Sequence, residues 1–288
     1  MRIDRHLTTA IFHPLQRAGL GARGFRLPIL MYHSISVDPQ TAVCPYYRTH
    51  THPDVFGRQL RLLAAEGYKT IKLADVIHWL AGGPTPPPKS VVITFDDGFS
   101  DFYLHAFPSL QELGFTATVF VPTGFIADPR RRWEDAEFLT WAEIRQMRKA
   151  GIEFGSHTVN HAELVKLPLP EVERELVQSK AELEQQLAEP ALNFAYPYAF
   201  PQCNAPFARN LRALLIKAGY ACCLTTEIGR VKSDDDPFRL KRLPINSLDD
   251  TPLLRAKLEG GYDWLGVPQR AFKLLKGSGQ KTPSASRQ

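Results

Sequence analysis

Short apolar runs alternate with segments of helical periodicity along most of the chain. Apolar runs predict strands over residues 28–33, 69–71, 91–95, 116–121, 152–155, 193–196 and 221–224. Apolar side chains three or four positions apart predict helices over 55–67, 74–80, 141–150, 170–187 and 207–217. Strands and helices that alternate at this spacing are typical of βα units around a mostly parallel sheet. The number of units favours a barrel or distorted barrel over a short open sheet.

The two ends of the chain differ in composition from its middle. A helix is predicted over residues 3–12, stopped by Pro14, and the glycine-rich stretch that follows predicts a linker. From residue 277 onward apolar residues are scarce, which predicts disorder. We therefore expect a basic N-terminal extension over 1–26, a single folded domain over 27–264, and a basic, partly disordered tail over 265–288.

The net charge of +5 belongs to these two ends. Residues 1–26 hold five arginines against one aspartate, residues 265–288 hold five basic residues and no acid, and the middle is left with a net charge of −4. A nucleic-acid-binding protein usually carries its basic patch on the folded domain, so no nucleic-acid partner is expected. Residues 268–276 form a basic amphipathic stretch of a kind that can rest on an anionic membrane, although both ends can equally be plain solvated segments.

Cysteine usage and hydropathy point to an intracellular setting. The four cysteines do not have the spacing of a disulfide framework or of a zinc-binding CxxC pair. The N-terminus lacks the continuous apolar stretch of a secretory signal, and no window is apolar enough for a transmembrane helix. The expectation is a cytoplasmic protein, peripheral to the inner face of the membrane if its basic ends bind lipid.

Polar clusters follow several of the predicted strands, where a barrel places its active site. Asp96 and Asp97 come directly after the strand at 91–95, and Gly98 permits a sharp turn. Two adjacent carboxylates at such a place are costly unless they are paired or bind a cation. Because neighbouring side chains diverge, one carboxylate can ligate a metal while the other faces substrate. The alternative is an exposed acidic turn at the start of a helix.

His157 and His161 follow the strand at 152–155. Histidines four positions apart share a face if the segment makes a helical turn. Two imidazoles and one carboxylate are the ligands of many catalytic zinc sites, which leave one position for water. A lone pair of surface or core histidines is the alternative, but the aspartate pair after another strand favours the metal site.

An aromatic segment, Tyr196-Pro197-Tyr198, closes the strand at 193–196. It can form the wall of a substrate groove, with the backbone N–H of Tyr198 directed at a developing oxyanion. It can also be an aromatic loop that only packs on the rim of the barrel.

The three segments in this order resemble the polysaccharide deacetylase family, also called the NodB-homology or carbohydrate esterase family 4 fold. Residues 94–98 match its first motif, Gly155-Ser156 with the two histidines match its second, and Tyr196-Pro197-Tyr198 matches part of its third. The resemblance spans roughly residues 28–244. It implies a distorted (β/α)7-type barrel, with 27–264 as a NodB-like deacetylase domain.

The resemblance also implies a chemistry, the hydrolysis of an N-acetyl group on a sugar or polysaccharide to acetate and a free amine. Its metal ligands, for a divalent ion that is most often zinc, would be Asp97, His157 and His161. Asp96 would be the general base that activates the metal-bound water. Tyr198 would donate its N–H to the oxyanion, and Tyr196 and Pro197 would contact substrate.

Two departures from the family pattern bear on the mechanism. The third motif commonly has an Arg and a Gly where this chain has Ala195 and Ala199, and no His follows His161 to serve as the usual general acid. The segment 30–35 resembles the first strand of the circularly permuted branch, which includes exopolysaccharide deacetylases, and there its His33 would be the general acid. A purely structural histidine at a strand end is the alternative.

The sequence leaves the substrate and two other functions open. Tyr47, in a loop near the predicted mouth, would contact sugar or cover the core. Substrates consistent with the expected location are an N-acetylated glycan and a lipid- or nucleotide-linked sugar. A non-catalytic carbohydrate-binding relative would explain the two departures, and a related amidase acting on a non-sugar C–N bond would use the same ligands.

Overall fold

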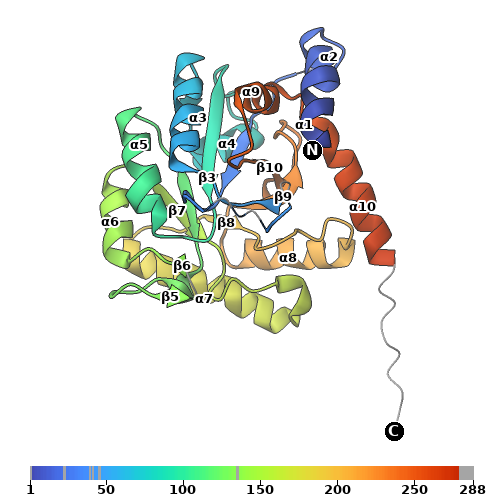
Figure 1. Cartoon of the computed structure of the whole chain (residues 1–288). Coiled ribbons are helices and arrows are strands. Elements are labelled where there is room, and N and C mark those ends of the chain that lie inside the picture. The colour runs from blue at the N-terminus through green and yellow to red at the C-terminus, as the bar shows by residue number, and fades with distance from the viewer. Residues whose placement is uncertain are drawn as a thin grey trace.

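Within the residues that the computed structural model describes, seven parallel strands close into a barrel (Figure 1). These residues are 2–21, 24–38, 40, 42–44, 47–133 and 136–278. The barrel strands are β1 (Ile29–Tyr32), β3 (Ser90–Phe95), β4 (Thr118–Val121), β7 (Glu153–Ser156), β8 (Asn193–Ala195), β9 (Cys222–Ile228) and β10 (Leu240–Pro244). Neighbours run in the order β1-β10-β9-β8-β7-β4-β3, and β3 pairs back onto β1. The predicted distorted (β/α)7 barrel in a single α/β domain is confirmed.

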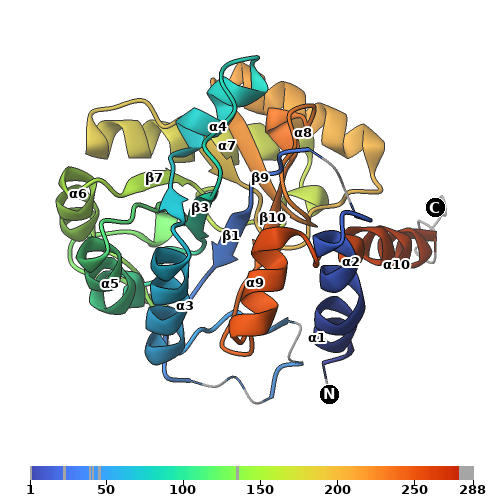
Figure 2. The same cartoon turned by 90° about the horizontal axis from the view of Figure 1, so that it is seen from above.

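Helices surround the strands when the molecule is seen from above (Figure 2). They are α1 (Ile3–Leu7), α2 (His13–Arg17), α3 (Pro53–Ala65), α4 (Leu73–Leu80), α5 (Phe107–Glu112), α6 (Trp141–Lys149), α7 (Leu169–Leu187), α8 (Ala205–Lys217), α9 (Thr251–Glu259) and α10 (Gly266–Ser278). The start of α6 shows why the beginning of this helix could be predicted from the sequence. The hydroxyl of Thr140 accepts from the backbone N–H of Glu143, and the Glu143 side chain accepts in return from the N–H of Thr140, which is a complete capping box.

Shorter elements complete the fold. Strand β2 (Lys69–Thr70) pairs in parallel with the start of β3, and β5 (Arg132–Trp133) forms a small antiparallel ribbon with β6 (Ala136–Glu137). Among the described residues, no helix is both long and apolar enough to cross a membrane. All four cysteines are free thiols, as their spacing predicts.

The sequence prediction missed β10 and α9 and made β9 too short. The five residues of β10, Leu-Lys-Arg-Leu-Pro, contain two cations and end in proline, so no apolar run marks them. The structure nevertheless buries Arg242 completely, because its guanidinium finds partners inside the barrel. A buried ion pair therefore takes the place of the apolar run on which strand recognition depends.

The N-terminal helical segment does not stop at Pro14. It passes through a π-helical turn at Thr8–Phe12 into α2, where Pro14 occupies the first turn. The ring of proline holds φ near the helical value, although Pro14 cannot donate an N–H to the preceding turn. The linker expected after this segment includes residues 22 and 23, which lie outside the described residues, as do residues 279–288 of the tail expected to be disordered.

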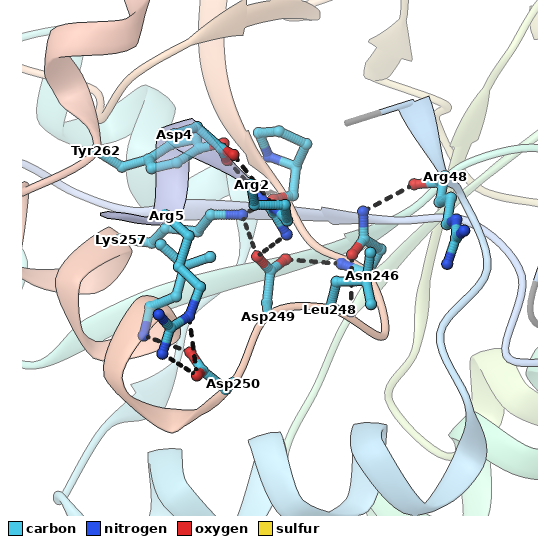
Figure 3. A network of polar contacts seen from close by, with 12 residues as sticks. Arg2, Asp4, Arg5, Arg48, Asn246, Leu248, Asp249, Asp250, Lys257 and Tyr262 are labelled. Carbon is cyan, nitrogen blue, oxygen red and sulfur yellow. Dashed lines mark hydrogen bonds and ion pairs between the residues drawn. The ribbon is translucent and has the colours of Figure 1, made fainter. Parts of the chain in front are cut away.

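Buried charges attach the N-terminal segment to the barrel (Figure 3). The Arg2 guanidinium donates to Asp4 and, across 3.1 Å, to Asp249. The carboxylate of Asp249 is fully buried and also accepts from the Lys257 ammonium at 2.9 Å and from the backbone N–H of Asn246 at 2.8 Å. Since Asn246 in turn donates to the backbone carbonyl of Arg48, the network reaches from the N-terminus to the loop at 47–49.

We expect Arg2→Ala to lower the free energy of unfolding by about 1.5–3 kcal/mol, the range for hydrogen bonds to charged groups. Arg5→Ala is the matched control, because Arg5 pairs with Asp250 at the surface, where such pairs contribute about 0.2–1 kcal/mol. Urea unfolding followed by circular dichroism measures both. Equal losses in the two variants would contradict the structural role of the buried network.

Candidate active site

A carboxylate and two imidazoles converge at the carboxyl ends of two barrel strands that flank β4. Asp97 follows β3, and His157 and His161 follow β7. The Oδ1 atom of Asp97 lies 3.4 Å from Nε2 of His157 and 3.1 Å from Nε2 of His161. One ligand atom from each residue lies within 4.8 Å of those of the other two. The structure thus brings together the three residues that the sequence analysis assigned as metal ligands.

The histidine loop is not the helical turn that the spacing suggested. Residues 157–161 have no helical structure, and Thr158 and His161 adopt left-handed backbone angles of 69° and 51° in φ. Asp97 and Tyr198 are also left-handed, at 74° and 59°. Such conformations cost of order 1–3 kcal/mol each for residues with a side chain and persist only where the surroundings hold them. Their concentration around one cavity indicates a site built for function rather than for stability.

Glu175 of α7 holds the histidine loop in this shape. Its buried carboxylate accepts from the backbone N–H groups of Val159 and Asn160, at 2.8 and 3.0 Å, and from the Asn160 amide at 2.7 Å. The sequence analysis did not identify Glu175, because one acidic residue in a long amphipathic helix carries no local signal. Its role is to position the two imidazoles.

The donor set fits a divalent cation. Nδ1 of the buried His157 lies 2.8 Å from the carbonyl oxygen of Ala195, which leaves Nε2 directed at Asp97. A backbone carbonyl on the other ring nitrogen is the usual support of a metal-binding histidine. Burial alone would raise the pKa of Asp97, but the two imidazoles hold it well below its ordinary value, so the carboxylate is ionised. Two imidazoles and an ionised carboxylate are ligands that suit zinc.

Asp96, the other carboxylate, pairs with Arg242 inside the barrel. Both guanidinium Nη atoms donate to it, each at 2.7 Å, and neither side chain is more than 3% exposed. Burial opposes ionisation of Asp96, but the charge of Arg242 outweighs it and lowers the pKa of the carboxyl below its ordinary value. The guanidinium also donates to Thr94 and to the carbonyl oxygen of Thr225, so it is fixed on β3 and β9 as well.

Arg242 was not identified in the sequence, and it bears on one of the two departures from the family pattern. The third motif has Ala195 where an arginine is common, and Ala195 is buried on β8. A guanidinium beside Asp96 is present all the same, but it comes from β10. No local pattern could have shown this pairing, because Asp96 and Arg242 are 146 positions apart in the sequence.

His33 follows β1 directly and lines the same cavity as the ligand cluster. Its Nε2 is 4.0 Å from Oδ2 of Asp96, and its side chain is 18% exposed. Burial lowers the pKa of the imidazole, although the charges of Asp97 and Asp96 oppose this effect. A lowered pKa makes the imidazolium a stronger acid.

A cavity of about 990 Å³ opens over these groups. Tyr198 lines it, and its ring packs against that of His161 with 4.6 Å between centroids. Tyr47 also lines the cavity, so both tyrosines lie where the sequence analysis placed them. Tyr196 also lines the cavity, although it is 1% exposed and packs its ring on Phe200. Pro197 is buried and is not among the residues that line the cavity. Contact of these two residues with substrate stays a prediction.

Carboxylates and histidines at the carboxyl ends of the strands of a parallel barrel are typical of α/β-barrel enzymes, hydrolases among them. Residues 83–222 match the family model for polysaccharide deacetylase. YxkH of Bacillus subtilis (strain 168), which is named as a polysaccharide deacetylase, is 29% identical over 221 residues, covering 77% of this chain and 72% of that protein. The chain is thus similar to the polysaccharide deacetylase family over residues 83–222 and to individual deacetylases over most of its length, which supports an enzyme of that class, a sugar N-deacetylase.

Solved structures agree with this assignment. The deacetylase PplD of Streptococcus pyogenes, determined with acetate, has a TM-score of 0.70 and 29% identity, covering 82% of this chain and 99% of that one. IcaB from Ammonifex degensii has a TM-score of 0.68 and 25% identity, with 82% and 98% covered. The poly-β-1,6-N-acetyl-D-glucosamine N-deacetylase of Escherichia coli (strain K12) is 34% identical over 112 residues, which are 35% of this chain and 16% of that protein.

Proposed function

We propose that this chain is a divalent-metal-dependent enzyme that removes acetyl groups from N-acetylated glucosamine residues of a glycan. One observation carries the proposal. The Asp97, His157 and His161 cluster lines the same cavity as Asp96, which pairs with the buried Arg242. The substrate class is supported by the names of the Escherichia coli and Staphylococcus aureus relatives, which are poly-β-1,6-N-acetyl-D-glucosamine N-deacetylases.

Asp97, His157 and His161 would hold the metal. A divalent cation bound there would polarise the acetamide carbonyl and lower the pKa of a water molecule. Asp96, which pairs with Arg242, would take a proton from the attacking water. The backbone N–H of Tyr198 would face the developing oxyanion, and His33 would donate a proton to the leaving amine nitrogen.

The two other functions that the sequence left open predict different assay results. The absence of the family's usual arginine and late histidine suggested a non-catalytic carbohydrate-binding protein. Arg242 and His33 both lie next to Asp96, which supports an enzyme instead. A non-sugar amidase would use the same residues with another substrate. Membrane contact through the basic ends, a cytoplasmic location and a lipid- or nucleotide-linked substrate stay predictions.

We expect metal removal to abolish acetate release from N-acetylated glycans and zinc to restore it. Chelation followed by dialysis should leave the fold intact by circular dichroism, because the barrel core is apolar and does not depend on the cation.

His157→Ala should lower bound zinc from about one per chain, measured by plasma emission spectroscopy, because it removes a buried ligand. His105→Ala is the control, because His105 is exposed and does not line the cavity. Full activity in the chelated protein would contradict the metal-dependent mechanism.

A further inference from the structure

Helix α10, which the sequence analysis assigned to the C-terminal tail, forms one wall of the catalytic cavity. Gln269, Phe272 and Lys273 line the cavity together with the ligand cluster. In both overall views α10 runs along the side of the molecule that carries α1 and α2 (Figures 1 and 2). The cavity therefore includes a segment outside the matched family region at 83–222.

Polar contacts fix α10 against the barrel. The Gln269 side chain accepts from the backbone N–H of Ile228 at 3.0 Å and donates to the carbonyl oxygen of Thr226 at 2.9 Å, which anchors α10 on the end of β9. The ammonium of Lys273 donates to the carbonyl oxygen of Phe200 at 2.7 Å, in the loop that also carries Tyr198. These contacts hold the helix at the mouth, so its inward residues are a stable part of the cavity.

Aromatic rings surround the cavity mouth and are exposed. Tyr47, Tyr198 and Phe272 line the cavity and are 63%, 54% and 52% exposed. Exposed apolar groups gathered at one place mark a binding site rather than a core. A pyranose ring has an apolar C–H face bordered by hydroxyl groups, and an aromatic ring offers a matching flat apolar surface. Arg48, Gln269 and Lys273 place polar groups beside these rings, which is the mixture that sugar rings require.

The volume of the cavity exceeds what one sugar needs. About 990 Å³ is at the upper end of the range of roughly 300–1,000 Å³ for sites that hold drug-sized ligands. A single N-acetylhexosamine is smaller than such a ligand. Tyr198 packs on the metal-ligating His161 and therefore belongs to the place of the reacting sugar. Phe272, on α10, would then contact another part of the substrate.

We propose that Phe272 is a binding platform for a sugar next to the one that loses its acetyl group, so that α10 selects oligomeric glycans over monosaccharides. This inference rests on the proposed function, since it names the substrate class of that same site. Phe272 acts through binding and not through the reacting atoms.

The test compares Phe272→Ala with wild type in the full, zinc-loaded chain, on the mono-, di- and pentasaccharide of β-linked N-acetylglucosamine. We expect the KM for the pentasaccharide to rise about tenfold with kcat unchanged, and activity on the monosaccharide to stay the same. Phe272→Trp should retain the wild-type KM. Leu274→Ala is the matched control, because Leu274 is also 52% exposed on α10 but lines a neighbouring cavity of about 460 Å³ and not the catalytic one. It should resemble wild type.

Calorimetric binding of the pentasaccharide separates this inference from the proposed function, because binding needs no turnover. Weaker binding by Phe272→Ala than by wild type supports the platform even if neither protein releases acetate, a result that would overturn the proposed function alone. Equal pentasaccharide affinity and equal KM in wild type and Phe272→Ala would overturn the platform. An equal loss on the monosaccharide and the pentasaccharide would overturn it too.

Discussion

Asp96→Asn is expected to lower acetate release by about 10²- to 10⁴-fold, the usual contribution of a positioned general base. The amide keeps the shape of the side chain and can still accept from Arg242 through its oxygen, but it cannot take up a proton at neutral pH. Because Asp97 and the two histidines are untouched, bound zinc should be unchanged. Initial rates of acetate release and the metal content of the same sample measure both quantities.

Asp101→Asn is the matched control for this prediction. Asp101 is a partly buried carboxylate five positions further along the chain, and it accepts from the Ser34 hydroxyl rather than from Arg242. Asp101→Asn should retain activity close to wild type. An Asp96→Asn enzyme with the wild-type rate would remove Asp96 from the mechanism.

Arg242→Met should destabilise the protein by about 3–5 kcal/mol, the cost of leaving a buried charge without its partner. The methionine fills much of the space, so the loss comes chiefly from the unpaired Asp96 carboxylate, which is 3% exposed. The same change should cost activity, because nothing then orients the proposed base. Denaturant unfolding and acetate release on one preparation test both effects.

A double substitution distinguishes loss of pairing from loss of packing. Adding Asp96→Asn to Arg242→Met removes the stranded charge, so the double variant should be more stable than Arg242→Met alone. Arg212→Met is the surface control, since Arg212 pairs with Asp236 where both side chains are well exposed, and such pairs contribute about 0.2–1 kcal/mol. If Arg242→Met lowered the free energy of unfolding no more than Arg212→Met does, the buried pair would contribute no more to stability than a surface pair.

The strand that carries the first motif could be predicted because its apolar run is continuous. β3 is buried at every position, and Asp96 and Asp97 follow it directly. The convergence of Asp97 with His157 and His161 could also be predicted, since parallel strands in one barrel present their carboxyl ends on the same side. The left-handed loop that joins the two histidines could not, because it depends on Glu175 from a helix further along the chain.

The rest of the site depends on contacts between distant segments. Arg242 looks like a surface residue in sequence, since a charged residue is almost never fully buried without a partner and its partner lies on another strand. The inward face of α10 was unpredictable for a related reason. Residues 268–276 have a basic amphipathic pattern, but that pattern does not say whether the apolar side meets lipid, solvent or a cavity. The structure places Phe272 at the cavity.

The closure of the barrel sets a lower limit on the piece of chain that can work by itself. β1 pairs with both β10 and β3, yet β1 and β10 lie on opposite sides of the matched segment 83–222. A fragment trimmed to that segment would keep the metal ligands but lose His33 and Arg242. It would also leave β3 and β8 as open edges with unpaired backbone groups, which invite intermolecular strand pairing. We therefore expect the fragment of residues 83–222 to aggregate and not to work as a minimal enzyme.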